Sequence, residues 1–393
     1  MKRIYQFFFI IILLTFSACA QNPVTGRHEL QFVSADKEIK MGQENYLYGQ
    51  QASGGQYRVD PKLSAYVQKI GQKLAKQSDR PDLPYEFVVL NDSVPNAWAL
   101  PGGKIAVNRG LLAHLDNEAE LAAVLGHEIT HAAARHGAKA MERQIIMATG
   151  LAAANVAITA SHKSSDPAYK DQALAASASV AAGLIGTKYS REAELEADSY
   201  GMNYMVKAGY DPHAAVTLQE TFVKLMDQKS SNWVDGLFAS HPPSQERAKA
   251  NQQRATQMPK NLELGKERYQ QMIAQLKKDQ TAYEAYDQGV KALKKEELTQ
   301  ALTLANQAIA LVPNEALFYT LQADIFAKRD DKEKAMSAYQ MAIEKNPEYF
   351  YHYHQRGLLL EKMGKKSEAK ADFEKAQKLL PTETAAAALK RLA

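Results

Sequence analysis

The segment His127-Glu128-Ile129-Thr130-His131 contains the residues whose spacing most clearly predicts chemistry. In an α-helix, two histidines four residues apart share one face, so both imidazoles can reach one metal ion. Neutral imidazole nitrogens suit Zn²⁺, and a site with three protein ligands leaves a fourth position for water. Glu128 is next to the first histidine and can take a proton from that water as general base. The motif therefore predicts one zinc ion per chain and a hydrolytic reaction.

A chance occurrence of this string is the alternative, because the chain contains ten histidines. Small and apolar residues flank the motif on both sides, as expected for a buried helix. They are Ala122, Ala123, Val124 and Leu125 before it, and Ala132, Ala133 and Ala134 after it. Two histidines and a glutamate on a buried helix need a partner that satisfies them, which favours a bound metal.

The third protein ligand has to come from another segment. His136 lies about 140° around the helix from His131, so we expect it to be a partly exposed structural residue rather than a ligand. Glu194 and Asp198 are four residues apart in an acidic helical stretch, and they share a face. One carboxylate on the metal and a second that accepts the free N–H of a ligand imidazole is a common arrangement around zinc. A solvated acidic face is the alternative, and it would be preferred without the upstream motif.

Hydrophobic patterning indicates the elements that position these residues. From Asn117 onward, apolar residues recur at three- and four-residue spacing, which predicts the helix that carries the motif. Phe87–Leu90 and Ile105–Val107 are short apolar runs bounded by turn-forming residues, and they predict strands. Asp211 followed by Pro212 predicts the start of another helix, with a capping side chain and a ring preset to helical φ.

Length and composition limit the classes of protein to which this chain can belong. Its 393 residues are enough for two domains, and 46% hydrophobic with 23% charged residues is typical of a folded protein. The formal net charge of +4 and the lack of a basic, aromatic-rich stretch argue against a nucleic-acid partner. A single cysteine excludes internal disulfides, a cysteine-ligated zinc and, given its position, a cysteine protease.

The N-terminal segment has the pattern of an export signal. Two basic residues precede the apolar run Phe7–Phe16, which is too short to span a bilayer comfortably. Small residues then precede Cys19, as in a bacterial lipoprotein signal that is cleaved before the cysteine. An ordinary secretory signal cut near Ala18 or Ala20 is the alternative. We expect residues 1–18 to be removed and Cys19 to anchor the protein by lipid in the periplasm, with Ala20 favouring the outer membrane.

The C-terminal part contains an internal repeat. Pro313, Pro347 and Pro381 are spaced by 34 residues, and alanines recur with the same period. Those alanines are Ala301, Ala335 and Ala369, then Ala308, Ala342 and Ala376. Small residues at fixed places let antiparallel helices approach closely, which is typical of tetratricopeptide repeats. A generic helical bundle is the alternative, but it predicts no fixed period.

The predicted fold class is mainly α with a small β-sheet, a peptidase domain followed by an α-solenoid of tetratricopeptide repeats. The predicted segments are a lipoprotein signal (1–18), a zinc metallopeptidase domain (19–255), a connecting helix (256–280) and the repeats (281–393). The repeats are expected at about 281–314, 315–348 and 349–382, with Ala385–Leu392 as a closing helix. Ile145–Ala160 and Ala173–Ile185 are Ala-rich and are interpreted as a helical hairpin over the active-site cleft.

Several motifs over most of residues 20–250 resemble those of the HtpX-type and CAAX-prenyl-protease-type zinc peptidases, which are gluzincins. The family's E-x-x-A-D block matches Glu194 through Asp198, which implies that Glu194 is the third ligand and that Asp198 supports a ligand histidine. An N-A-x-A-x-P-G-G motif matches residues 96–103, and an H-P-P motif followed by Arg matches residues 241–243 and Arg247. The resemblance therefore implies a gluzincin-like zinc peptidase fold.

The resemblance implies two further site hypotheses. The first is an exposed edge strand beside the zinc, to which a substrate adds by backbone hydrogen bonds. Its residues are Gly102, Gly103, Lys104, Ile105, Ala106 and Val107. The second is that His241 approaches the metal from a loop, where it either stabilises the oxyanion or occupies the open zinc position and keeps the enzyme latent. An ordinary hairpin edge and a loop histidine without a metal role are the respective alternatives.

These observations predict an exported zinc endopeptidase that cleaves unfolded or misassembled envelope proteins, with Glu128 as general base. Exported relatives with repeats also imply outer-membrane assembly machinery as a partner. A periplasmic chaperone or scaffold that acts through its repeats, with a mostly latent protease, is the alternative of a different class. Zinc-dependent hydrolysis of a small amide is a third and weaker hypothesis, because such an enzyme has no need of repeats.

Overall fold

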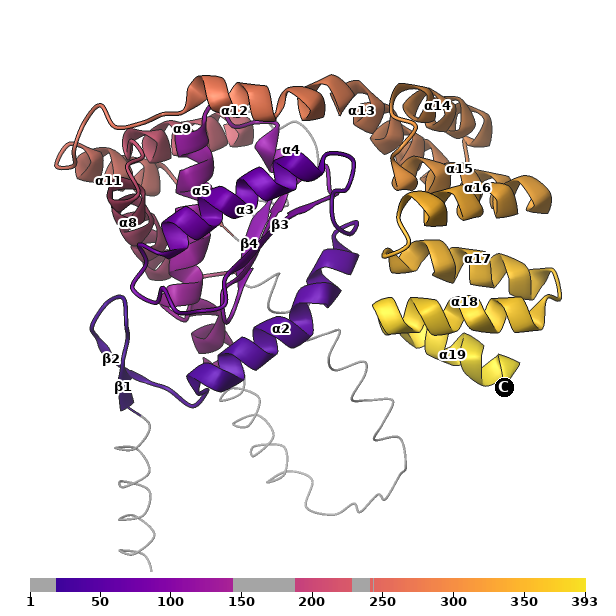
Figure 1. The fold of residues 1–393 in the computed structure, drawn as a ribbon, viewed down its shortest axis with the longest axis horizontal. Coiled ribbons are helices and arrows are strands. Elements are labelled where there is room, and N and C mark those ends of the chain that lie inside the picture. The colour runs from indigo at the N-terminus through magenta and orange to yellow at the C-terminus, as the bar shows by residue number, and fades with distance from the viewer. Residues whose placement is uncertain (1–18, 144–187, 228–240, 243) are drawn as a thin grey trace, which may run out of the picture.

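The computed structural model describes residues 19–143, 188–227, 241–242 and 244–393. The predicted signal segment and the two Ala-rich stretches within residues 145–185 lie outside the described residues. In the described part the protein is mostly helical with two small sheets, which confirms the predicted fold class. The sheets belong to the N-terminal part, and paired helices make up the C-terminal part (Figure 1).

A three-stranded sheet lies at the centre of the N-terminal part. Its strands are β3 (Glu86–Leu90), β4 (Ala97–Leu100) and β5 (Lys104–Asn108), in the order β3-β5-β4. β5 pairs in parallel with β3 and antiparallel with β4. A separate antiparallel pair, β1 (Cys19–Gln21) and β2 (His28–Leu30), precedes this sheet in the chain.

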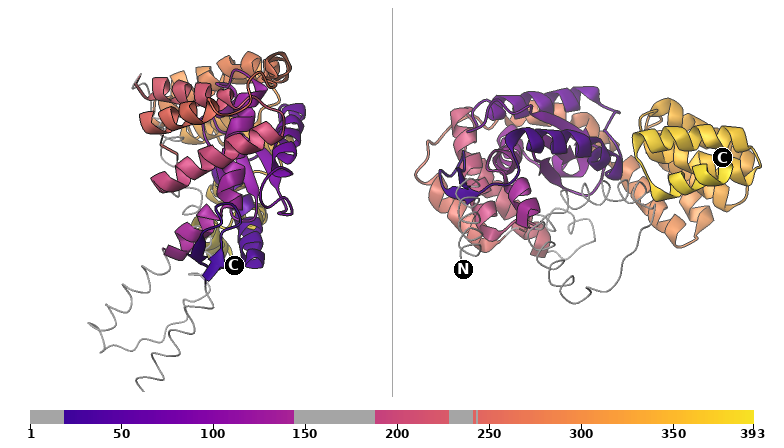
Figure 2. Two further views of the ribbon diagram at one scale, coloured as in Figure 1. Left: turned by 90° about the vertical axis from the view of Figure 1, so that its left-hand side faces the viewer. Right: turned by 90° about the horizontal axis from the view of Figure 1, so that it is seen from below.

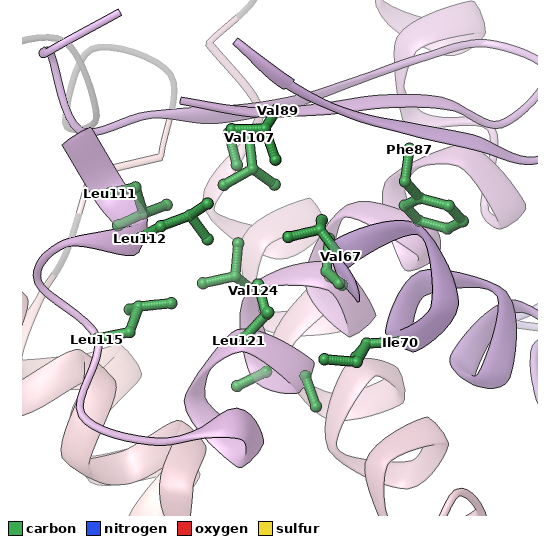
Figure 3. Close-up of a cluster of buried hydrophobic side chains, with 14 of the residues drawn as sticks. Val67, Ile70, Phe87, Val89, Val107, Leu111, Leu112, Leu115, Leu121 and Val124 are labelled. Carbon is green, nitrogen blue, oxygen red and sulfur yellow. The ribbon is translucent and has the colours of Figure 1, made fainter. Parts of the chain in front are cut away.

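Helices cover both faces of the three-stranded sheet. On one face, α3 (Pro61–Ala75) and α5 (Glu118–Ala133) pack against β3 and β5. Figure 3 shows Val89 and Val107 of the sheet pointing toward Val67, Leu121 and Val124 of these helices. On the other face, α2 (Ala35–Ala52) packs Met41 and Tyr46 against Leu90, Trp98, Leu100 and Ala106. The sheet is therefore a buried layer that fixes where α5, the helix of the zinc motif, can lie.

The prediction of an exposed substrate strand at Gly102, Gly103, Lys104, Ile105, Ala106 and Val107 is wrong. β5 is the middle strand, so both of its backbone edges are used by β3 and β4. All of these residues are buried. A strand that is apolar on both faces is typical of a sheet interior, which is the physical reason for the error. Gly102 has a φ of 77°, and a Cβ there would stand 2.6 Å from the Ile39 Cα, so the turn itself requires glycine.

Side chains cap the helices that carry the site. The Asn117 Oδ1 accepts the Glu120 N–H at 2.9 Å at the start of α5, which confirms the predicted start of this helix. The Ser190 Oγ accepts the Ala193 N–H at 3.2 Å at the start of α8 (Arg191–Lys207). The Asp211 Oδ1 accepts the His213 N–H at 2.9 Å before α9 (His213–Asp227), as predicted. Further helices of this part are α4 (Arg109–Leu112), α11 (Gln245–Ala255) and α12 (Lys266–Met272).

The C-terminal part consists of antiparallel helix pairs. The pairs are α13 (Ala274–Lys294) with α14 (Leu298–Leu311), α15 (Ala316–Lys328) with α16 (Lys332–Lys345), and α17 (Phe350–Lys362) with α18 (Lys366–Leu379). α19 (Glu383–Leu392) packs on the last pair. Ala301, Ala335 and Ala369 are fully buried where the helices of each pair meet, as the 34-residue period predicts. The proposed boundary at residue 280 falls inside α13, so the connecting helix continues into the first repeat.

The repeats form a body beside the N-terminal part, as seen from below in Figure 2. A buried polar cluster joins the two parts: the Asn91 Nδ2 donates to the Glu315 carboxylate at 2.9 Å, and the Tyr283 hydroxyl donates to it at 2.7 Å. The Arg109 guanidinium lies 3.4 Å from the centre of the Tyr283 ring. These contacts fix the start of α15 and the helix α13 against the residues that follow β3 and β5. Among the helices described, none has the length and apolar character needed to cross a membrane.

Candidate metal centre

Four side chains from two helices and one loop converge on a single point. His127 and His131 project from α5, with their Nε2 atoms 3.0 Å apart. Glu194 of α8 places its Oε2 3.4 Å from the His127 Nε2 and its Oε1 3.4 Å from the His131 Nε2. His241, just before α11, places its Nδ1 3.1 Å from the Glu194 Oε1 and 3.3 Å from the His127 Nε2. One ligand atom from each of the four residues lies within 4.8 Å of all the others.

The donor set of this cluster fits zinc. Imidazole nitrogens and a carboxylate oxygen are the ligands that Zn²⁺ takes in tetrahedral sites. The protein's own charges also favour a cation here. Burial alone would lower the pKa of His127, but Glu194 and Asp198 raise it to about 10. Burial would raise the pKa of Glu194, yet His241 and His127 hold it far below its usual range. The carboxylate thus stays ionised and ready to bind a metal.

Asp198 lies behind His127 and is held by Arg247. The His127 Nδ1 is 3.0 Å from the Asp198 Oδ1, so the nitrogen that faces away from the cluster has a carboxylate acceptor. The Arg247 Nε and Nη2 donate to the two Asp198 oxygens at 2.8 and 2.7 Å. Burial would raise the pKa of Asp198, but Arg247 and His127 lower it. The arrangement fixes the ring orientation of His127.

Arg247 also reaches two other parts of the site. Its Nη1 lies 2.7 Å from the Glu194 Oε2, and it donates to the Pro242 carbonyl at 3.2 Å. One guanidinium therefore ties the ligand carboxylate, the outer carboxylate and the loop that carries His241. The sequence motif contained this arginine, but its contacts could not be predicted because they depend on how α11 packs against α8.

Glu128 lies on the side of the cluster that His241 faces. Its Oε1 is 3.5 Å from the His241 Nε2, and its buried Oε2 has no hydrogen-bond partner among the described residues. Burial raises the pKa of Glu128. A cavity opens beside these residues, and mostly apolar side chains line it. They include Ala97, Val124, Met202, Leu218 and Phe222.

The expected exposure of His136 is wrong. Its residue exposure is 2%, its Nδ1 lies 2.8 Å from the His131 Nδ1, and its Nε2 lies 3.2 Å from the Glu196 Oε2. α5 ends at Ala133, and Arg135 adopts a left-handed φ of 62°. The chain therefore turns back toward His131, and the helical angle that placed His136 away from the site does not apply.

Tyr189 is a site residue that sequence reasoning missed. Its ring stacks on the His131 ring with centroids 3.9 Å apart and planes 17° apart. It is buried, so it closes one side of the cluster. A tyrosine just before an acidic helix gives no signal of such a contact. Cys19 begins β1, opposite Leu30 of β2, and its lipidation stays a prediction.

The sequence also matches known proteins. The profile of Peptidase family M48 matches residues 61–255, and that of a tetratricopeptide repeat matches residues 338–371. Over 237 residues the chain is 30% identical to the β-barrel assembly-enhancing protease of Escherichia coli (strain K12), covering 57% of this chain and 46% of that protein. It is 34% identical over 234 residues to the mitochondrial metalloendopeptidase OMA1 of Schizosaccharomyces pombe, covering 57% and 63%. It is 32% identical over 198 residues to the metalloprotease YcaL of Escherichia coli (strain K12), covering 50% and 72%.

The chain matches less than half the length of the β-barrel assembly-enhancing proteases, 40 to 46%. The family assignment rests instead on the coverage of the metalloprotease YcaL and on the matched profile, which spans the zinc motif, Glu194 and Arg247. The geometry agrees with it, because a cluster of metal-binding side chains lies within the matched region. The chain belongs to peptidase family M48 and carries C-terminal tetratricopeptide repeats.

Proposed function

We propose that this protein is an exported zinc-dependent endopeptidase that cleaves unfolded or misassembled envelope polypeptides. The observation that carries the proposal is the convergence of His127, His131, Glu194 and His241 within 4.8 Å, with Glu128 beside them. His127, His131 and Glu194 would hold the ion. Relatives named as a metalloprotease, a metalloendopeptidase and an assembly-enhancing protease support the reaction class.

Zinc, when bound, supplies a Lewis acid that polarises the scissile carbonyl and acidifies water. Glu128 takes a proton from the attacking water while the oxygen of that water bonds to the carbonyl carbon. Glu128 then gives that proton to the leaving amine as the C–N bond breaks. Burial raises the pKa of Glu128, which makes its carboxylate a stronger proton acceptor than an exposed one. Asp198 and Arg247 keep His127 oriented throughout.

We also propose that His241 acts as a latch in this conformation, meaning a fourth protein ligand that occupies the open position of the metal. A catalytic zinc site needs an open position, and a fourth protein ligand closes it. The His241 Nδ1 lies as close to Glu194 and His127 as a shared ion would require. The hydrogen bond from Arg247 to the Pro242 carbonyl holds the loop in place. Moving this loop away would admit water and substrate. Stabilisation of the oxyanion remains the alternative role for His241.

The cavity and the sheet indicate where on the protein a substrate would bind. The apolar side chains beside Glu128 suit a large hydrophobic substrate residue. β4 has no strand on its other side in the described part of the chain, and its residue Ala97 lines the same cavity. We propose that an extended substrate pairs with this edge of β4. Ala97 and Ala99 are only 2% and 5% exposed, so the edge has to be uncovered first, in agreement with a latent enzyme.

The sequence pattern supports the proposals of export and a lipid anchor, and the named relatives support the proposed partner. The basic and apolar residues before Cys19 support removal of residues 1–18 and a lipid anchor in the bacterial envelope, with Ala20 favouring the outer membrane. The relatives named for β-barrel assembly support outer-membrane assembly machinery as a partner. The repeats would then present unfolded polypeptide segments to the peptidase.

The decisive experiment uses Glu128→Gln in the mature full-length protein. The variant is expected to keep one zinc per chain and to lose cleavage of an unfolded protein such as reduced casein, while a chelator abolishes cleavage by the wild type. Cleavage by Glu128→Gln at the wild-type rate would reject Glu128 as the base. The alternative function, a chaperone or scaffold that acts through its repeats, would be favoured by a different result. In that result the purified wild type and the His241→Ala variant both bind unfolded proteins but never cleave them.

A further inference from the structure

The two histidine ligands on α5 differ in what supports them from behind. The outer nitrogen of His127, Nδ1, faces the Asp198 carboxylate directly. The outer nitrogen of His131, also Nδ1, faces a third imidazole instead, that of His136, at 2.8 Å. The far nitrogen of His136 in turn faces the Glu196 carboxylate at 3.2 Å. His131 and His136 are both buried, so solvent does not supply these hydrogen bonds.

The hydrogen atoms along this row can be assigned in only one direction. The His131 Nε2 faces His127 and Glu194, so it is the nitrogen that binds the metal and must be without a proton. The Nδ1 of a neutral His131 then carries the proton and donates it. The His136 Nδ1 is the acceptor, which leaves the proton of a neutral His136 on Nε2. That N–H donates to Glu196, whose carboxylate can only accept.

We propose that His136 and Glu196 are positioning residues for the ligand His131, joined to it as an imidazole–imidazole–carboxylate row. The inference rests on the proposed zinc site. The row fixes the ring orientation and the tautomer of His131, as the direct carboxylate of Asp198 does for His127. α8 thereby supplies three acids with different tasks: Glu194 for the metal, Asp198 for one histidine and Glu196 for the other.

The backbone turn that brings His136 to His131 is itself held in place. Arg135 adopts the left-handed conformation, which is costly for a residue with a side chain. Its guanidinium is buried, pairs with the buried Glu38 carboxylate and donates to the Val33 carbonyl at 2.6 Å. These contacts from the start of the N-terminal part keep the turn closed. A strained turn held from outside is expected where the position of the next residue matters.

Glu196 has a matched neighbour that allows a clean control. Both Glu196 and Glu192 lie on α8, and both contact the Arg27 guanidinium. The Glu192 side chain is 69% exposed, whereas the Glu196 side chain is 16% exposed and also meets His136. Replacing either acid removes one carboxylate from Arg27. Only the replacement of Glu196 breaks the row to His131.

The test measures zinc affinity by competition with a chromophoric chelator, using full-length Glu196→Ala, Glu192→Ala, His136→Leu and His136→Gln. Glu196→Ala and His136→Leu are expected to bind zinc about 10- to 100-fold more weakly, the range found when such outer partners are removed. Glu192→Ala should bind like the wild type. His136→Gln keeps an acceptor and a donor, and it should recover most of the affinity lost in His136→Leu. The visible spectrum of the Co²⁺-loaded proteins should change in the same two variants.

Equal zinc affinity in Glu196→Ala and the wild type would overturn the proposal. So would equal losses in Glu196→Ala and Glu192→Ala, because the effect would then come from Arg27. If His136→Leu fails to fold, the comparison of Glu196→Ala with Glu192→Ala still decides the question. A purely structural role would lower the unfolding temperature of the metal-free protein and leave zinc affinity unchanged. A wild type that binds no zinc would instead reject the proposed function.

Discussion

Gly201 of α8 lies against Gly126 of α5 with no space for a side chain between the two backbones. A Cβ at Gly201 would stand 2.9 Å from the His127 backbone nitrogen, and a Cβ at Gly126 would stand 3.0 Å from the Gly201 carbonyl oxygen. This close crossing sets the distance between the histidines of one helix and the acids of the other. Glu194 and Asp198 reach His127 and His131 only because both crossing positions are glycine.

Gly201→Ala is therefore expected to displace α8 and to weaken the metal site. The inserted methyl group meets backbone atoms that cannot rotate away, and such overpacking costs about 1–3 kcal/mol of unfolding free energy. Zinc affinity should fall as well, which the chelator competition measures. Asn203→Ala, an exposed position in the same helix, is the control and should change neither quantity. Unchanged zinc affinity in Gly201→Ala would show that the site tolerates a shift of α8.

His241→Ala separates the two roles proposed for this histidine. If His241 closes the metal site, its removal opens a position for water, and the cleavage rate of reduced casein should rise several-fold. If it stabilises the oxyanion, kcat should instead fall by about 10²- to 10³-fold. We expect the rise, because the His241 Nδ1 already lies 3.1 Å from the ligand carboxylate of Glu194.

His213→Ala controls for the loss of a histidine, since His213 contacts Asp211 away from the site. It should leave the rate unchanged. A fall in kcat for His241→Ala, with zinc content intact, would reject the latch role of His241 and support stabilisation of the oxyanion.

The parts of the site that follow from local helical geometry could be predicted from the sequence. His127, Glu128 and His131 lie within one helix, where the spacing alone fixes their common face. Glu194 and Asp198 also share a helix face, although only the family motif indicated which of them would face the metal. The prediction of the repeats succeeded for a similar reason, because each copy repeats the same local contacts.

The predictions failed where the chain leaves regular structure or pairs over long distances. The predicted position of His136 was wrong because α5 ends before this residue. The helix is interrupted at Arg135, which adopts a left-handed conformation and is held by Glu38 and Val33. The order of strands in a sheet depends on pairing between distant segments, and a short apolar run does not reveal its neighbours. The absence of polar alternation in Ile105–Val107 was the available sign of a central strand.

Arg247→Met tests how much of the site depends on one guanidinium. Its removal leaves the Asp198 and Glu194 carboxylates buried without their cation, a change that typically costs about 3–5 kcal/mol. The metal-free protein should unfold at lower urea, and bound zinc should recover part of the loss by binding the freed carboxylate. Lys249→Met, an exposed position in α11, is the control. Equal urea midpoints for the two metal-free variants would contradict this account of Arg247.

Asp324 in α15 is expected to make the repeats more stable at acidic pH. Burial raises its pKa from 3.8 to about 7, although the Tyr339 and Tyr351 hydroxyls donate to it at 2.5 and 3.4 Å and oppose the shift. The folded state then holds a proton that the unfolded state has released. This bound proton stabilises the folded state fully below about pH 4. The free energy of unfolding then declines as the pH rises to about 7, because the folded state binds more protons than the unfolded state over that range.

Asp324→Asn keeps an acceptor for both hydroxyls and removes this proton. Its urea midpoint relative to the wild type should therefore rise between pH 5 and pH 8. Asp330→Asn is the control of opposite sign, because Lys362 lowers the pKa of the exposed Asp330 and its loss should give no gain at pH 8. Parallel pH dependence in the wild type and Asp324→Asn would mean that Asp324 is ionised throughout this range.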